Sequence, residues 1–369
     1  MKKLYTVIFV FVLFSSLSVT AFAGDGDIDS YYEEFSYDDM ISSLDSSVID
    51  ILNEIGITEI SYESIFSVTP KKVLDSLYEM FKDGFSEPFK YFLSITGVMA
   101  LMSLITNISR SPETVTLIGS CCVSCFLSVP VVSLITRSFS VLETLSVFTS
   151  SFAVVLCAVT SAAGGAIQGT SFLGMNVALN SVMTVILSAV SKPLCNVMCS
   201  LSFLSCFNIK TFSERMSDLI KKAYIFILGA LTTVFSGVSG VKAILGSSAD
   251  TVAIRGVKFL VGRSIPLVGG VVSESYQSVI ASLQLIKSTV GVFGIITVVV
   301  TVLPIILELI IWCFMLSFIS TMGDVLGSFK IQNLILIFKD VLILLIATIV
   351  FSSVLFIISC GFMLVFKNG

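Results

Sequence analysis

The chain has 369 residues, of which 55% are hydrophobic and only 12% are charged, and its mean hydropathy is +1.02. An ordinary soluble domain carries about 25% charged residues. A soluble protein of this length has too little interior to bury so much apolar surface. The composition therefore excludes a soluble protein and predicts an all-α, polytopic helical membrane protein with a short exported N-terminal helical domain.

Several kinds of enzyme chemistry are excluded by missing residues. The chain contains no His, which excludes histidine-based acid–base catalysis and histidine metal sites. Neither the G-x-x-x-x-G-K-[ST] loop that binds nucleotide phosphates nor the G-x-S-x-G turn of serine hydrolases occurs. We expect no catalytic residue, no cofactor, no metal and no nucleic-acid partner. An ATP-driven role would need a separate ATPase.

Residues 1–23 have the pattern of a signal peptide. A basic start precedes a mostly apolar run over 4–17, and a small-x-small cleavage site ends at Ala23. Cleavage there leaves Gly24 at the start of the mature chain, and an uncleaved first membrane helix is the alternative. Under either interpretation the segment that follows is exported.

Residues 24–89 form an acidic exported domain. They carry sixteen Asp or Glu and three Lys, a net charge of −13, whereas residues 90–369 carry a net charge of +7. Apolar residues recur at helical spacing over 48–55 and 73–81, and Pro70 fits the first position of a helix. We predict two or three short amphipathic helices. Because about 65 residues make a marginal core, we expect them to dock on the membrane part or on a partner; a solvated acidic face is the alternative.

Membrane helices are predicted over 90–241 and 289–369, where apolar runs approach the roughly 20 residues that one span needs. The 289–321 run is too long for one perpendicular helix and too short for a pair. Pro304 and Glu308 interrupt it, which suggests a broken or strongly tilted helix. We predict about 7–8 spans. The candidate runs are 91–108, 115–135, 146–163, 172–190, 193–209, 223–241, 289–321 and 341–366.

Residues 242–288, between these two blocks, contain two amphipathic patterns. Each places apolar residues on one helical face and polar residues on another, so we predict helices at the membrane interface or on the bundle. Between them, Pro266, Gly269 and Gly270 predict a turn. Proline fixes φ, and the glycines can adopt positive φ or allow a close backbone approach. We expect valine at Gly269 or Gly270 to redirect both helices.

Lys and Arg do not settle the orientation of the spans. With eight spans and an exported N-terminus, seven basic residues fall on the inner side and nine on the outer side. The basic character of 242–288 argues against its lying outside. A re-entrant span is therefore one possibility that the sequence leaves open.

All nine cysteines lie within predicted apolar spans. None is in the exported domain, where a disulfide framework would be expected. We interpret them as small buried hydrophobic residues. A metal or redox site around Cys121, Cys122 and Cys125 is the alternative.

Small and polar residues mark candidate helix contacts. Small residues allow close helix approach, and a carboxylate at membrane depth is a functional hypothesis by default. For Glu308 the alternatives are a proton or cation position at a broken helix and a polar contact that holds the bundle together. The candidates for close approach are 161–166, Gly229, Gly237, Gly240, Gly291 and Gly294.

The layout of the chain and the stretch from 256 to 304 resemble a known family, stage III sporulation protein AE of endospore-forming Firmicutes. The order of signal peptide, acidic domain and membrane helices is similar over essentially the whole chain, whereas the specific sequence motif is confined to residues 256–304. It reads Gly256-x-Lys258-Phe259, then Ile265-Pro266-x-Val268-Gly269-Gly270-x-x-Ser273-Glu274-Ser275, then Ile286-Lys287-x-x-x-Gly291-x-x-Gly294 and Pro304.

The resemblance implies a non-enzymatic protein of the mother-cell membrane that faces the forespore. It implies membership of a transenvelope channel complex, or feeding tube, that sustains forespore integrity and late forespore gene expression. The implied partners are other membrane and ring-forming components, a secretion-type ATPase and a forespore channel protein.

Two other functions stay open at this point. One is a self-sufficient secondary transporter or permease, with a broken helix around Pro304 and Glu308 at its substrate site. An inverted or parallel repeat would favour it, and none is clear. The other is an intramembrane enzyme, against which the missing His, paired membrane Asp and nucleophile motif all argue.

Overall fold

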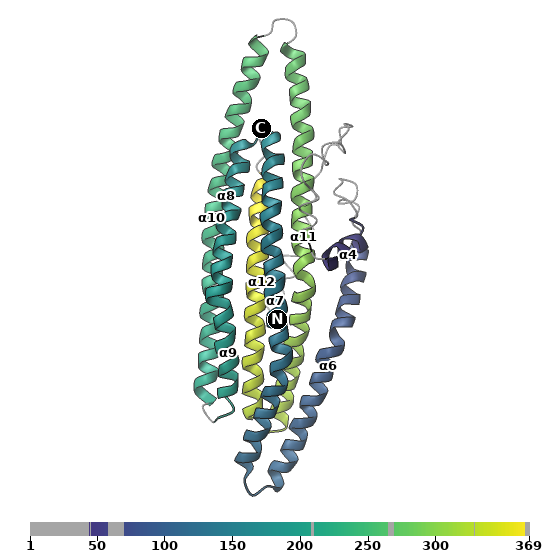
Figure 1. Ribbon diagram of the computed structural model, residues 1–369, viewed down its shortest axis with the longest axis vertical. Coiled ribbons are helices and arrows are strands. Elements are labelled where there is room, and N and C mark those ends of the chain that lie inside the picture. The colour runs from purple at the N-terminus through teal and green to yellow at the C-terminus, as the bar shows by residue number, and fades with distance from the viewer. Residues whose placement is uncertain are drawn as a thin grey trace.

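The computed structural model describes residues 44, 46–57, 70–207, 210–264, 269–327 and 329–365. These residues form an elongated bundle of long helices without a strand among them (Figure 1), so the predicted all-α class is confirmed. The predicted signal peptide, 1–23, lies outside the described residues. The elements are α4 (Ser46–Ile55), α6 (Pro70–Ile108), α7 (Pro112–Ala162), α8 (Ala166–Val185), the π-helix η2 (Ile186–Ser191), α9 (Lys192–Leu204), α10 (Lys210–Ser264), α11 (Gly269–Val325) and α12 (Phe329–Val365).

In this part of the chain, six helical segments are long and apolar enough to cross a membrane. A multi-pass membrane protein is therefore supported, and the predicted count of 7–8 spans is somewhat more than the six found among the described residues. The count falls because predicted runs merge: 115–135 and 146–163 both lie in α7, and 172–190 and 193–209 lie in the continuous series α8, η2 and α9. The six segments are Gly84–Ile108, Pro112–Ala162, Ala166–Leu204, Phe212–Gly256, Ile280–Val325 and Ile331–Leu364.

Helix α7 continues through the polar positions that separated two predicted spans. Arg137 of α7 pairs with Glu308 of α11, and Glu143 of α7 pairs with Lys192 at the start of α9. Each charge therefore has a partner on a neighbouring element, and the helix continues past it. The result is a 51-residue helix. At about 1.5 Å per residue it is more than twice as long as a hydrocarbon core of about 30 Å is thick.

The predicted runs 172–190 and 193–209 form one continuous helical series because of the π-helix η2. Pro193 has no N–H and cannot donate to the preceding turn. Just before it the helix widens, and the N–H of Lys192 donates to the carbonyl of Leu187, five residues earlier. A single π turn of this kind lets a helix absorb a local mismatch without ending. Helices α8 and α9 therefore continue as one rod.

The N-terminal helices confirm part of the sequence pattern. Helix α6 begins at Pro70 as predicted, but it runs without a break into the first apolar run and contains Pro88. The amphipathic stretch at 73–81 is therefore not a separate short helix. Helix α4 covers the other predicted stretch, and its apolar face packs against α6 and α11, with Val48, Leu52 and Ile55 all buried.

The two amphipathic stretches of 242–288 are the adjoining ends of α10 and α11. Both helices extend well past the ends of their neighbours, as Figure 1 shows at the top of the molecule. The stretches are thus continuous with apolar helices rather than separate interfacial ones. Pro266 lies outside the described residues.

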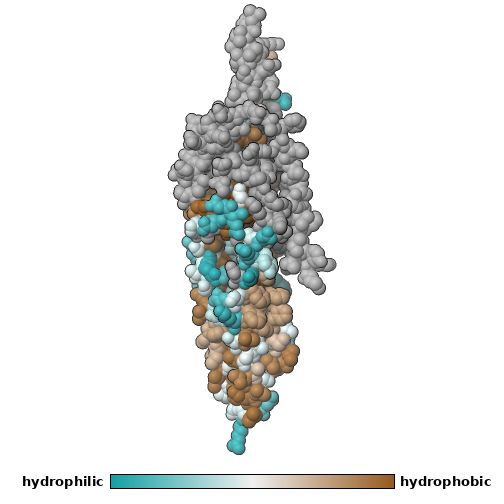
Figure 2. Space-filling view, turned by 90° about the vertical axis from the view of Figure 1, so that its right-hand side faces the viewer, coloured by the Kyte–Doolittle hydropathy of each residue, from teal (hydrophilic) through white to brown (hydrophobic). Residues whose placement is uncertain are grey.

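Helix α12 forms the centre of the bundle. It contacts α7, α8, α9, α10 and α11 and carries buried Phe338 and Phe356. By contrast, α6 exposes much of its apolar surface, including Leu93, Leu101 and Leu104. Figure 2 shows that face of the molecule, with hydrophilic side chains around the middle and hydrophobic ones over the lower end. A broad apolar outer surface is expected of helices that contact lipid.

Candidate functional site

A cavity of about 370 Å³ lies between α4, α7 and α11. It brings together two of the residues selected from the sequence, Pro304 and Glu308. Its wall combines one cation, one anion, three hydroxyl groups and apolar side chains. The lining residues are Val48 and Ile51 of α4, Arg137, Ser140, Val141 and Thr144 of α7, and Thr301, Pro304, Ile305 and Glu308 of α11.

The charged part of this wall is the pair between Arg137 and Glu308. Arg137 Nη2 donates to Glu308 Oε1 over 2.5 Å, although the two residues are 171 positions apart in the chain. The Glu308 side chain is only 19% exposed, whereas the Arg137 side chain is 49% exposed. The carboxylate is therefore largely shielded, whereas about half of the Arg137 side chain stays exposed. Glu308 therefore already has one cationic partner, and the choice between a polar contact and a cation position at Glu308 stays a prediction.

Helix α11 contradicts the predicted break at Pro304. It runs as one α-helix from Gly269 to Val325 with Pro304 inside it. A proline removes only one hydrogen bond of the helix. Packing on both sides retains the helix, since Thr301 and Ile305 are buried and the Thr301 hydroxyl donates to the Thr297 carbonyl. The carbonyl four residues before Pro304 still lacks its usual helical N–H donor, next to the cavity.

Helix α4 closes one side of the cavity. Val48 and Ile51 line it, while Ser76 Oγ of α6 donates to Glu54 Oε2 of α4 over 3.1 Å. The described helix of the acidic domain thus packs on the chain's own long helices. The sequence pattern located this helix, but the position of its apolar face over Arg137 could not be read from it.

The predicted glycine turn is only partly within the described residues. Gly269 and Gly270 are the first two residues of α11, and Pro266 is not described. The described glycines with positive φ lie elsewhere, at Gly56, Gly164 and Gly327. A functional role of the Pro266–Gly270 segment stays a prediction.

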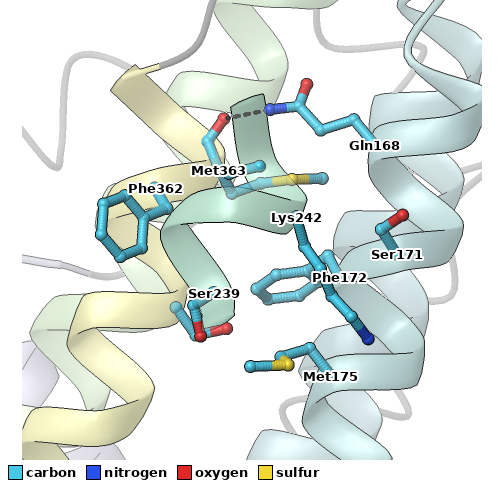
Figure 3. A pocket seen from close by; sticks show the side chains of 10 residues that line it. Gln168, Ser171, Phe172, Met175, Ser239, Lys242, Phe362 and Met363 are labelled. Carbon is cyan, nitrogen blue, oxygen red and sulfur yellow. Dashed lines mark hydrogen bonds between the residues drawn. The ribbon is translucent and has the colours of Figure 1, made fainter. Parts of the chain in front are cut away.

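A second polar cluster surrounds the turn between α7 and α8. Asp250 of α10 accepts hydrogen bonds from the backbone N–H groups of Ile167 and Gln168, over 3.0 and 2.8 Å, at the start of α8. The Gln168 side chain accepts from Lys287 Nζ of α11 over 3.1 Å. It also donates to the Met363 carbonyl of α12 over 3.4 Å, as Figure 3 shows. Asp250, Gln168 and Lys287 are all buried. A carboxylate at a helix N-terminus satisfies free N–H groups and the helix dipole.

The cluster of Asp250, Gln168 and Lys287 lies beside the turn within 161–166, which was predicted from its small residues to allow close helix approach. Gly164 has φ +86°, and a Cβ there would lie 3.0 Å from Ile254 of α10. Beside the cluster is a cavity of about 30 Å³, lined among others by Gln168, Ser239 and Lys242. Sequence analysis placed Asp250 and Lys287 within the amphipathic 242–288 stretch and quoted Lys287 only as part of the family motif, so neither was selected as a site residue. The sequence feature that could have identified them is that Asp250 and Lys287 are isolated, oppositely charged residues next to apolar runs.

The remaining interhelical ion pair joins α10 to α12 through Lys221 and Asp340, 2.5 Å apart. Among the described residues, no group of three or more His, Cys, Asp or Glu could hold a metal. All nine cysteines are free. Cys195, Cys206 and Cys360 are buried as predicted, whereas the prediction is wrong for Cys122 and Cys125, whose side chains are exposed on α7.

Comparison with known proteins gives a family match that covers nearly all of the helical bundle. The family described as Stage III sporulation protein AE matches residues 57–366, which include Arg137, Pro304 and Glu308 but not α4. A protein of Bacillus subtilis (strain 168) named Stage III sporulation protein AE is 25% identical over 154 residues, which cover 42% of this chain and 39% of that relative. The aligned part thus spans well under half of the relative's length, and no solved structure matches. Because the family match covers most of the chain, the chain belongs to the stage III sporulation protein AE family.

Proposed function

We propose that the chain is a non-enzymatic, multi-pass membrane component of the mother cell–forespore channel, required for endospore formation and late forespore gene expression. The observation that carries this proposal is the family match over residues 57–366. Family membership supports the role in sporulation, and the assignment to the mother cell–forespore channel is our further proposal.

The architecture supports a role in assembly rather than in chemistry. Among the described residues, three interhelical ion pairs and the Asp250 cluster join helices to one another, so these charged groups contribute to packing. Much of α6 and α10 is apolar and exposed, which suits contact with lipid or with membrane partners. The proposed partners are other stage III sporulation membrane and ring components, a secretion-type ATPase and a forespore channel protein. We place the chain in the mother-cell membrane with residues 24–69 exported.

The alternative of a self-sufficient transporter has lost its main support. It required a broken helix around Pro304 and Glu308, and α11 is continuous there. Discontinuous helices at mid-membrane are the usual substrate sites of such transporters.

The test is deletion of the gene in its own spore-forming host, followed by time-lapse microscopy with a membrane dye and a fluorescent reporter of late forespore transcription. We expect engulfment to finish, the reporter to stay dark and the forespore to collapse. The full-length chain, supplied in the mother cell only, should restore spores. Normal spores after deletion, or rescue only by expression in the forespore, would contradict the proposal.

A further inference from the structure

The cavity between α4, α7 and α11 has the mixed chemistry of a ligand site. Ligand pockets usually enclose about 300–1,000 Å³ and combine apolar walls with a few converging polar groups. This cavity, at about 370 Å³, has apolar side chains from all three helices, and its polar groups converge from α7 and α11. No other cavity described above combines a cation and an anion in one wall.

Arg137 has unused hydrogen-bonding capacity at this site. Of its several N–H donors, one contacts Glu308, and the hydrogen bonds of the described residues give the others no protein acceptor. A guanidinium binds phosphate oxygens with geometry that a lysine cannot match. With its side chain 49% exposed, Arg137 can bind an anionic group without first leaving Glu308.

Glu308 restricts which anionic ligand can enter. Its carboxylate lies in the same wall, so a ligand that carries only negative charge meets repulsion close to Arg137. A ligand with a phosphate and an ammonium group a few bonds apart can use both charges. The hydroxyl groups of Ser140 and Thr144 are further donors or acceptors around it, and the Thr301 oxygen can accept a hydrogen bond.

The surroundings indicate that such a ligand comes from the membrane. On α7 the only charged residue between Glu113 and Glu143 is Arg137, and on α11 the only one between Lys287 and Asp324 is Glu308. The cavity is therefore a polar opening in the flank of two long apolar helices. Val141 and Ile305 line it alongside α4, where they can contact an acyl chain.

We propose that this cavity binds the headgroup of a zwitterionic phospholipid, with its phosphate on Arg137 and its ammonium on Glu308. The chemical class is a phosphate ester of an amino alcohol, and phosphatidylethanolamine is the simplest example. Because α4 forms one wall, the bound lipid contacts the acidic exported domain as well as the bundle.

The test measures lipid binding by native mass spectrometry of the purified full-length protein after delipidation. Dilauroyl phosphatidylethanolamine and the matching phosphatidylglycerol are the probes. We expect wild type to prefer phosphatidylethanolamine, and Arg137→Gln to weaken its binding by about tenfold or more, the scale of one lost charge-assisted hydrogen bond. Glu308→Gln should instead remove the preference, leaving the two lipids about equal.

The matched control is Lys192→Gln, which removes a cation that pairs with Glu143 of the same helix α7 but does not line the cavity. It should bind both lipids like wild type. Equal losses in Arg137→Gln and Lys192→Gln would overturn the proposal, as would equal binding of the two lipids by wild type. Displacement of the lipid by millimolar inorganic phosphate would assign the site to a free anion and would overturn it too. If Arg137→Gln does not fold, the lipid preference of Glu308→Gln decides the question alone.

Discussion

At the scale of single residues, Arg137 and Glu308 have the largest consequences for the bundle. Each is the sole charge in a long apolar stretch of its helix. A lone charge at the centre of a membrane helix costs about 2.5–3.5 kcal/mol on insertion scales. Their contact removes much of that cost for both helices, so we expect the two residues to depend on each other.

We predict that Glu308→Leu lowers the free energy of unfolding by about 1–3 kcal/mol, because it leaves Arg137 without a partner. Glu308→Gln keeps a hydrogen-bond acceptor and should cost less. The double variant Arg137→Leu/Glu308→Leu should be more stable than Glu308→Leu alone, since an apolar pair removes both charges together. Thermal unfolding of the purified variants in one detergent measures this, and simple addition of the two single losses would contradict it.

At the scale of helices, small residues act where two backbones approach, and only the structure distinguishes these positions. A Cβ at Gly294 of α11 would lie 2.2 Å from the Phe152 ring of α7, and one at Gly291 would lie 2.5 Å from Leu364 of α12. At Gly229 and Gly237 of α10 nothing lies within 4 Å. The prediction of close approach is thus confirmed for the first pair and wrong for the second.

Alanine substitutions test this difference directly. We predict that Gly294→Ala destabilises the protein by about 1–3 kcal/mol through overpacking against Phe152. Gly237→Ala is the matched control, and it should be neutral or stabilise by up to about 1 kcal/mol, because alanine favours a helix over glycine. Unfolding of the two variants side by side gives the answer. A neutral Gly294→Ala would show that Phe152 moves aside without cost.

The turn between α7 and α8 depends on a partner from a third helix. We predict that Asp250→Ala destabilises this region by about 3 kcal/mol or more, because it removes the acceptor of two backbone N–H groups and an anion that interacts electrostatically with buried Lys287. Amide hydrogen exchange at Ile167 and Gln168 should accelerate. Adding Lys287→Met should recover part of the stability, and unchanged exchange in Asp250→Ala would contradict the prediction.

At the scale of the whole molecule, the acidic N-terminal part is continuous with the bundle through α6. Because α6 begins at Pro70 and continues to Ile108, a deletion that ends at residue 89 would cut inside a helix. Residues 24–69 form the better unit for deletion. They carry twelve Asp or Glu and no Lys or Arg, a net charge of −12, and they include α4.

We predict that deleting residues 24–69 leaves membrane insertion intact but weakens assembly with the proposed sporulation partners. A strongly acidic segment is repelled by anionic lipid surfaces, so its contacts should be with protein. Co-purification from sporulating cells is the measurement, with membrane protein level as the control. Replacement of 24–69 by a Gly/Ser linker of equal length separates lost contacts from lost spacing. Full assembly of the deletion protein would contradict the prediction.

Features that depend on neighbouring residues could be predicted from the sequence alone. Hydropathy indicates the membrane class because apolar surface on this scale cannot be buried in a soluble fold. Helical periodicity located α4, and the fixed φ of Pro70 located the start of α6. The residues from 256 to 304 indicated the family, which the match over 57–366 confirms.

Features that depend on distant partners required the tertiary structure. A charged residue within an apolar run ends a membrane span when its side chain has to be solvated. When an oppositely charged side chain from another helix pairs with it, the helix can continue through that position. Only folding brings Glu308 to Arg137, Lys192 to Glu143, and Asp250 to the start of α8. The positions of these partners could not be read from the sequence, because the free energy of a charge within an apolar bundle is set by what lies beside it in space.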